Sequence, residues 1–591
     1  IHRLARRHLL GAYGDLLAFW APFLLLHLGG TDTITAFALE DNELLRRHLL
    51  NLLFQLGAAG YVFYQSLPSN KLIVSTILVF IGGIIKYIER TRALYLGSTK
   101  KFRASLLTSG DAGPNYAKLM EEHSSKKKAN IPVSIVMMPE PNVQSTDPVK
   151  KVENKWNDKV IDPAFCNFKI FKGLLVHLIF SFRERDESMD FFRSRTAKDA
   201  FRVIEAELNF FYDVLYTKAA VVHCLTGCLF RALSIGFVIT AFALFYVLNK
   251  QSFHEYDRKI HSSFALHMLH ARWSKSIFQY NLIDSQLGRW PKWIEKFLDF
   301  ISLRELFDDW KFGREEQYDD KLGELIFNEL KQKSSDVEDP ERVDLERVKL
   351  MCAARGKWAL DKQARKGSLR SDSNVDCGEI LLPSVSNVDY GESFLLWHIA
   401  TDLCYNTDTD TDTNTETNAR TKDLRENSKI LSDYMLHLLI KQPNMMSTVV
   451  GIGEIRFRDT CAEMDKFISD VSEGNQEKMT KEIVCQRLLD VPTKVKPVDV
   501  KGDRSKSALF DACILAKVLR KLGNKWEILS GVWVELLGYA AIHCRPYNHA
   551  QQLSKGGELV TLVWLLMVHL GLSEQFQIVE GHARAKLIVQ K

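Results

Sequence analysis

Two long apolar runs in the sequence limit most strongly what this chain can fold into. Leu72–Ile88 carries its only charge, Lys86, near one end, and Ala219–Leu248 is 30 apolar-rich residues interrupted by Arg231. A membrane-spanning helix needs about 20 apolar residues, with about 17 as the lower limit. Both runs reach that length, so the sequence predicts a membrane helix at each of them.

A third apolar stretch, Leu49–Tyr64, lies shortly before the first run, and Pro68 marks a turn between them. This stretch contains polar residues and could form the core helix of a soluble domain, but the short connection favours a membrane hairpin. Arginines flank the hairpin on both sides (Arg46, Arg47, Arg90 and Arg92). Because Lys and Arg gather on the cytoplasmic side of membrane helices, both flanks are predicted to face the cytoplasm.

The segment before the hairpin is harder to place. Leu16–Leu28 is short and contains Pro22, which suits an interfacial or re-entrant helix or the end of a longer one. The chain begins with Ile1 rather than Met, so we expect a fragment or an incomplete gene model, with its N-terminal membrane region truncated.

Arg231 allows two placements of the last membrane helix. The simpler one spans Ala232–Leu248 and leaves Arg231 at the membrane boundary. The alternative puts Arg231 inside the membrane, where a charged side chain needs a partner and marks a functional polar site.

The predicted fold class is mainly α, with a helical transmembrane region and a large helical soluble C-terminal region. Apolar residues return at helical spacing in Phe191–Tyr216 and Ser393–Tyr405, and Glu558–Leu572 is too short to span and should be a buried core helix. Five regions follow along the chain: a truncated N-terminal membrane region (1–88), a polar cytosolic insertion (89–218), a membrane helix (219–248), an irregular linker (249–285) and a soluble helical domain (286–591).

Charge and cysteine content bear on partners and compartment. A net charge of +5 over 591 residues gives no case for nucleic acid. The ten cysteines form no CxxC pair, so neither a zinc site nor a disulfide scaffold is predicted. The expected partners are the lipid bilayer and unidentified proteins.

Candidate chemical groups give no site. His398 and Asp402 are four residues apart and could form an acid–base pair, but a local helix-face contact is commoner. His223, Cys224 and Cys228 have metal-like spacing without a fourth ligand, and Thr407–Thr417 lacks the glycine and glutamate of a calcium loop. No catalytic, cofactor-binding or metal-binding residue is predicted, and an enzyme is not expected.

Trp20–Asn42 (WAPFLLLHLGGTDTITAFALEDN) resembles the opening of a plant family of multi-pass membrane proteins, catalogued as domain of unknown function 4220. Members of that family carry a C-terminal domain of unknown function 594. Further stretches resemble the family in the same order: Ile84–Arg90, Tyr212–Ala220, Gln279–Leu282, Trp397–Leu403, Leu431–Leu439, Glu558–Gly571 and Ala585–Gln590. The resemblance implies location and architecture, and it supplies no catalytic residues.

The resemblance also implies a further hydrophobic segment after Leu248, but Gln251–Asp284 holds no apolar run long enough to span. Losing one span would place residues 286–591 across the membrane from residues 89–218. Either this copy is degenerate or its gene model is faulty, and we suspect the latter because both departures fall where exon errors would remove whole helices. The leading hypothesis is an integral protein of an unidentified membrane that acts as a scaffold or interaction protein. The alternatives are a transporter or channel subunit that uses Arg231, and, less favoured, a membrane-bound enzyme.

Overall fold

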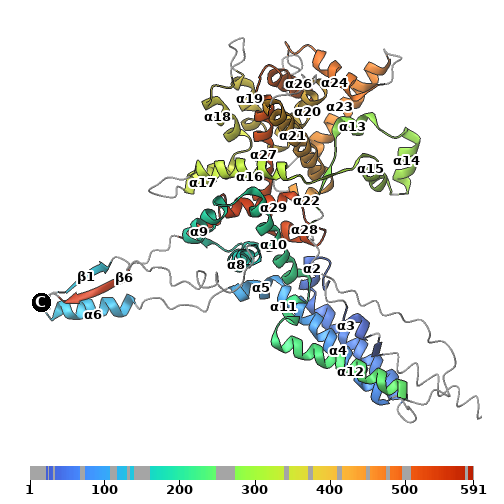
Figure 1. Cartoon of the computed structure of the whole chain (residues 1–591), viewed down its shortest axis with the longest axis vertical. Helices are drawn as coiled ribbons and strands as arrows, with labels where there is room; N and C mark the ends of the chain where they lie inside the picture. Colours follow the sequence, from blue (N-terminus) through green and yellow to red (C-terminus); the bar gives the residue numbers. More distant parts are fainter. Residues whose placement is uncertain are drawn as a thin grey trace, which may run out of the picture.

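The computed structural model is predominantly α-helical, which confirms the predicted fold class. It describes residues 22–23, 25–30, 34–66, 73–106, 116–129, 133–138, 160–247, 273, 275–301, 303–337, 345–369, 377–408, 416–446, 453–473, 479–495, 507–578 and 584–589. Figure 1 shows three parts: a large helical body, a rod of helices that projects from it, and a small unit at its side.

The rod consists of α3 (Leu45–Ser66), α4 (Ile73–Gly97) and α12 (Leu225–Val247), as Figure 1 shows. Helices α3 and α12 lead away from the body, and α4 returns to it. Small residues let α4 and α12 approach closely: Val79 packs on Ala241, and the Ser234 hydroxyl donates to the Gly82 carbonyl at 3.2 Å. Such small-residue contacts are typical of helices that pack within membranes.

A joint between rod and body forms around Gly29 and Gly30, within the stretch that carries the family resemblance. The buried Lys218 ammonium donates to the carbonyls of Gly29 (2.8 Å) and Gly30 (3.2 Å), and the Arg90 guanidinium donates to the Leu28 carbonyl (2.8 Å). Cations favour a helix C-terminus because its last carbonyls lack intrahelical partners. Residues 25–28 are helical; of the rest of Leu16–Leu28, only residues 22 and 23 are described.

Further elements complete the joint and the N-terminal half of the body. At the joint lie α2 (Leu39–Glu43), α5 (Thr99–Leu106) and α11 (Ala219–Val222), and the body begins with α8 (Ile161–Phe171), η1 (Lys172–Val176), β2 (Phe180–Ser181), α9 (Phe182–Arg193) and α10 (Ala197–Tyr216). Side-chain caps define two of these helix starts: Ser181 accepts from the Glu184 N–H, and Thr196 accepts from the Asp199 N–H.

The C-terminal half of the body is a stack of helices. Their bounds are α13 (Leu282–Leu287), α14 (Lys292–Phe300), α15 (Arg304–Phe312), α16 (Asp320–Ser335), α17 (Leu345–Ala353), α18 (Lys357–Arg365), α19 (Gly378–Ser386), α20 (Tyr390–Thr407), α21 (Glu416–Lys441), α22 (Pro443–Met446), α23 (Gly453–Glu473), α24 (Lys481–Asp490), α26 (Ala508–Leu519), α27 (Lys525–His543), α28 (Pro546–Leu553) and α29 (Leu559–His569). Every residue of α29 is buried, so the prediction of a core helix here is confirmed.

One hydrophobic core runs through both halves of the body. Phe201, Ile204 and Leu208 of α10 belong to the same buried cluster as Leu330 of α16 and Leu562 of α29. The helices α8–α10 and the C-terminal helices therefore share one packed body. A lost span would separate residues 89–218 from residues 286–591, and the shared core argues against that separation, because the apolar face of α10 is buried by the C-terminal helices.

Three short two-stranded sheets join distant parts of the sequence. Strand β1 (Val133–Met138) pairs antiparallel with β6 (Arg584–Val589) beside α6 (Tyr116–Lys128), and β2 pairs parallel with β5 (Phe576–Ile578). Within the body, β3 (Ser276–Gln279) pairs antiparallel with β4 (Arg314–Gln317). Hence the end of the segment expected as an irregular linker contains β3 and α13, while residues 248–272 lie outside the described part of the chain.

Candidate functional site

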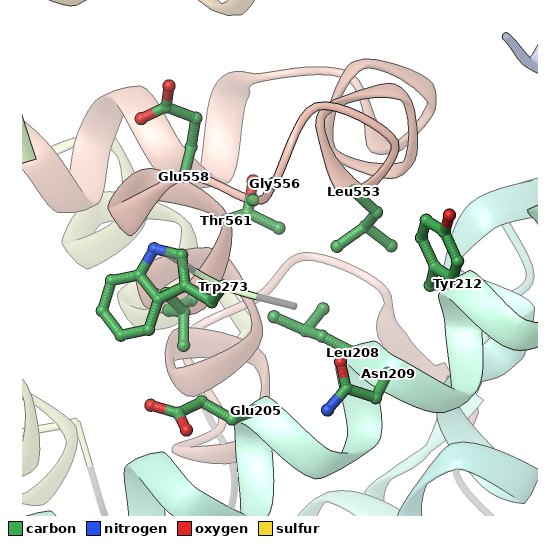
Figure 2. Close-up of a pocket in the computed structure, with 11 residues that line it drawn as sticks. Glu205, Leu208, Asn209, Tyr212, Trp273, Leu553, Gly556, Glu558 and Thr561 are labelled. Carbon is green, nitrogen blue, oxygen red and sulfur yellow. The ribbon is translucent and has the colours of Figure 1, made fainter. Parts of the chain in front are cut away.

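A small pocket lies between α10 and the turn that joins α28 to α29, with Trp273 at its side (Figure 2). Its volume is about 40 Å³. Eleven residues line it: Glu205, Leu208, Asn209, Tyr212, Trp273, Leu553, Gly556, Gly557, Glu558, Thr561 and Leu562. The four residues from α10 are spaced to form one stripe along that helix.

Two glycines shape the turn that brings Glu558 to the pocket. Gly556 and Gly557 have φ values of +103° and +79°, a conformation that residues with a Cβ atom rarely adopt. A Cβ atom on Gly557 would also lie 3.3 Å from Cδ1 of Trp273. The Gly-Gly pair therefore lets the backbone turn sharply and lets the indole approach it.

Glu558 lies at the start of α29 with its carboxylate held from one side. The Tyr434 hydroxyl donates to Oε2 of Glu558 at 3.1 Å and accepts from the Val560 N–H at 3.0 Å. Burial raises the pKa of Glu558 to about 7, against the opposing effects of the Tyr434 hydrogen bond and the Lys555 charge. This carboxyl therefore exchanges its proton near neutral pH.

Glu205 and Trp273 supply the other polar groups of the pocket. Burial raises the pKa of Glu205, although the charges of Lys275 and Arg202 act against the shift. The indole Nε1 of Trp273 is buried and has no hydrogen-bond acceptor among the described residues. In Figure 2 the Asn209 amide lies beside Glu205 on the same face of α10. The pocket thus combines two carboxyls, an amide and a free indole donor.

These groups suit binding better than covalent chemistry. The lining includes hydrogen-bond acceptors and donors, but no Ser, Cys, His or Lys is among the residues that line it. A volume of about 40 Å³ accommodates ordered water or a small polar group. A single ligand group that both donates to a carboxylate and accepts from the indole N–H would fit this set of partners.

A buried Ser–His–Glu chain lies away from the pocket. The Ser188 hydroxyl is 2.8 Å from Nδ1 of His569, and Nε2 of His569 is 2.9 Å from Oε2 of Glu207. Phe192 stacks on the imidazole at 4.3 Å, and all three polar residues are buried. These three residues have the composition of a catalytic triad, but none of them lines the pocket. We therefore interpret the hydrogen-bonded Ser–His–Glu chain as a connection between α9, α10 and α29.

His398 and Asp402, considered from the sequence as a possible acid–base pair, each have other partners. Nδ1 of His398 lies 2.8 Å from the Ser432 hydroxyl, and Nε2 accepts from the Leu282 N–H at 3.4 Å, while Asp402 pairs with Lys429 (3.0 Å) and Lys481 (3.2 Å). Burial lowers the pKa of His398 to about 4, so the ring is neutral at pH 7. His398 is therefore part of a polar core network.

The other residues considered from the sequence lie apart from the pocket. The thiols of Cys224 and Cys228 donate hydrogen bonds to the carbonyls of Val221 and Val222, respectively. The half-buried Arg231 lies within α12. In the described part of the chain, no group of three or more His, Cys, Asp or Glu is placed to hold a metal ion. Residues 409–415 of the acidic loop lie outside the described residues.

The pocket residues were missed from the sequence. Glu558 belongs to a stretch that the sequence predicts as a core helix, and in the structure it is the N-cap residue of α29. Glu205 and Asn209 are four apart within an amphipathic helix, a spacing that signals a shared face but not what covers that face. Only the packing of α10 against α29 brings these groups together.

Comparisons with known protein families give two matches along the chain. Residues 7–268 match the family described as domain of unknown function (DUF4220), and residues 520–572 match protein of unknown function, DUF594. The chain therefore carries both domains of unknown function that the resemblance implied. No curated protein and no solved structure matches it.

The pocket lies where the two matched regions meet. Its α10 residues fall in the first region, and Leu553–Leu562 fall in the second. The Ser188–His569–Glu207 chain crosses the same boundary. The two regions thus form one structural unit, although they are far apart in the sequence.

Proposed function

We propose that this protein is a multi-pass integral membrane protein whose rod crosses the bilayer and whose helical body is a scaffold for other proteins at one membrane surface. The carrying observation is the apolar exterior of the rod. Large apolar side chains point outward on all three helices, among them Leu53 and Phe54 (α3), Val74 (α4), and Leu229 and Ile239 (α12). Exposed apolar surface of this extent marks contact with lipid or another protein.

Helix α12 carries the strongest part of this argument. Among the described residues, it is the one helix that is long and apolar enough by composition to cross a membrane. Only 11% of its apolar stretch is buried, whereas a core helix of a soluble protein would be covered. Helix α4 is slightly longer than α12 but carries Lys86, Glu89 and Arg90 in its half nearer the body. We propose that α3 and α4 cross beside α12.

The two ends of the rod differ as the ends of a membrane region do. Tyr61, Tyr64 and Tyr246 are exposed near the end far from the body, where an aromatic belt would meet the headgroups. Arg47 and Arg92 lie near the body end. Because positive charge favours the cytoplasmic face, the body is proposed to be cytosolic. The resemblance to a plant membrane-protein family agrees with this arrangement.

A scaffold role follows from what the body offers. Its core is continuous and its pocket is small. A body of this kind presents a fixed surface to partners rather than a site for turnover.

Alkaline carbonate extraction of membranes that contain the full-length chain tests the anchoring. The chain should stay in the pellet, whereas release into the supernatant would overturn the proposal. Leu233→Lys/Ile239→Lys places two charges on exposed positions of α12 and should release part of the protein. Ile455→Lys, at an exposed position of the body, should leave extraction unchanged. Proximity labelling of the intact protein then tests the scaffold role, which requires a reproducible set of neighbouring proteins.

A further inference from the structure

Helices α14 and α15 expose two matching apolar stripes. Trp293, Phe297 and Phe300 are spaced four and three residues apart on α14, and Leu303, Phe307 and Trp310 repeat that spacing across the start and length of α15. This spacing puts each set on one helix face. All six side chains are exposed, with Phe300 at 86%, Trp310 at 79% and Trp293 at 72%. These six residues are called the aromatic face below.

The aromatic face is unusual because exposed aromatic side chains gather there. Single apolar residues on a protein surface are normal, but contiguous ones indicate a contact surface. Leu298 alone among the apolar residues of α14 is buried in the body. Figure 1 shows α14 and α15 extending from the body on the side toward which the rod slants.

Several charged residues of the two helices pair with one another. Arg304 pairs with Asp299 at 2.9 Å and with Asp308 at 3.6 Å, and it lies 3.7 Å from Glu295. Arg289 adds a second cation beside Glu295 at 3.3 Å. The ion pairs link α14 to α15 and, among the described charged residues of this region, cancel most of the charge that could select a highly charged partner.

We propose that the aromatic face of α14 and α15 inserts into the headgroup layer of the membrane that holds the rod, with zwitterionic phospholipid as the ligand. This inference rests on the proposed membrane anchoring. Each helix has 9 residues, which is about 14 Å, so neither can span a bilayer but both can lie along its surface. Tryptophan favours the interface between water and lipid because its ring is apolar and its N–H is polar.

Tethering makes a surface of this modest size sufficient. The rod holds the body beside the bilayer, so insertion of the aromatic face is an intramolecular event at high effective concentration. Each stripe has at most three aromatic side chains, so the aromatic face alone would bind free vesicles weakly. It is sufficient to set the orientation of a body that is already anchored. The paired charges fit a zwitterionic surface and would gain little from an anionic one.

Photo-crosslinking tests this contact directly. The full-length protein is reconstituted in phosphatidylcholine vesicles that contain a photoactivatable phosphatidylcholine, and crosslinked peptides are mapped. Lipid should attach to residues 293–310 as well as to α12. Trp293→Ser/Phe297→Ser/Phe300→Ser should lower the yield at residues 293–310 about tenfold, since each lost ring weakens partition into lipid. Leu350→Ser/Ile455→Ser, at exposed apolar positions elsewhere, should leave it unchanged.

The outcomes separate this inference from the proposed anchoring. Lipid on α12 without lipid on residues 293–310 would overturn the inference and leave the anchoring intact. Lipid on neither segment would overturn both. Crosslinks that join residues 293–310 to a second copy of the chain, with no lipid attached there, would show a protein interface and overturn the inference as well.

Discussion

The Glu558 carboxyl is buried at the turn into α29 while only Tyr434 donates to it through its side chain. Its folded pKa of about 7 lies above the ordinary glutamate value of 4.5. A carboxyl with a raised folded pKa holds its proton more tightly when folded, so its contribution is most favourable below about pH 4.5 and is lost as the pH rises through about 7. Above that pH the buried charge costs roughly 3 kcal/mol at most.

Glu558→Gln removes this buried charge and keeps an acceptor for Tyr434. We expect the variant to unfold at a higher temperature than the parent at pH 8 and at the same temperature at pH 4.5. Thermal unfolding of the detergent-solubilised protein measures both. Glu574→Gln, at an exposed position, is the matched control and should show no such dependence. A parallel shift of both variants at pH 8 would contradict the assignment of the effect to burial.

At the scale of elements, a buried charge network joins α20, α21 and α24. Lys429 of α21 pairs with Asp402 of α20 at 3.0 Å and with Asp433 at 2.7 Å, and Lys481 of α24 lies 3.2 Å from Asp402. These favourable charges outweigh burial and hold the pKa of Asp402 below its usual value. The network fixes how the three helices pack, because each buried charge needs its partner.

Lys429→Met should therefore be strongly destabilising. It leaves Asp402 and Asp433 short of a buried cation, and the loss of one partner of a buried pair costs about 3–5 kcal/mol. Lys321→Met is the control, because Lys321 pairs with Asp423 at 2.8 Å on the surface. Denaturant titration should show a large decrease in the free energy of unfolding for the first variant and none for the second. Equal effects would contradict the importance of burial.

Much of the helical content follows from the sequence, but the contacts between helices do not. The periodicity of Phe191–Tyr216 predicts a helix there, and α10 covers Ala197–Tyr216, while α9 ends at Arg193 and a short turn leads to the Thr196 cap. Nothing local in α10 indicates that α29, more than 300 residues later, covers it. The pocket between them could not be predicted for that reason, and neither could the strands β1 and β6, which pair across most of the chain.

At the scale of the whole molecule, the body is one folding unit built from both matched regions. The Ser188–His569–Glu207 chain and the Tyr216 hydroxyl, which donates to the Ala550 carbonyl at 3.0 Å, connect its two halves. His569→Phe keeps a ring against Phe192 but removes the hydrogen bonds that the imidazole makes with the buried Ser188 and Glu207. An unsatisfied buried polar group costs about 1–3 kcal/mol, and more if it is charged.

We expect His569→Phe to raise amide hydrogen exchange in α9 and α10 together with α29, since these helices share a core. Mass spectrometry of exchanged peptides provides the measurement. His543→Gln, at a half-buried position, should change exchange only near its own helix end. Faster exchange confined to α29 in the His569 variant would contradict a single folding unit.

The most direct test of the central claim asks whether both halves of the body lie on the same side of the membrane. Glu187→Cys in α9 and Arg520→Cys after α26 place thiols at exposed positions of the two halves. Sealed vesicles that contain either variant, compared with the parent chain, are treated with a membrane-impermeant maleimide before and after permeabilisation. Both thiols should be labelled under the same condition. Labelling of one thiol from outside and of the other only after permeabilisation would contradict the shared core.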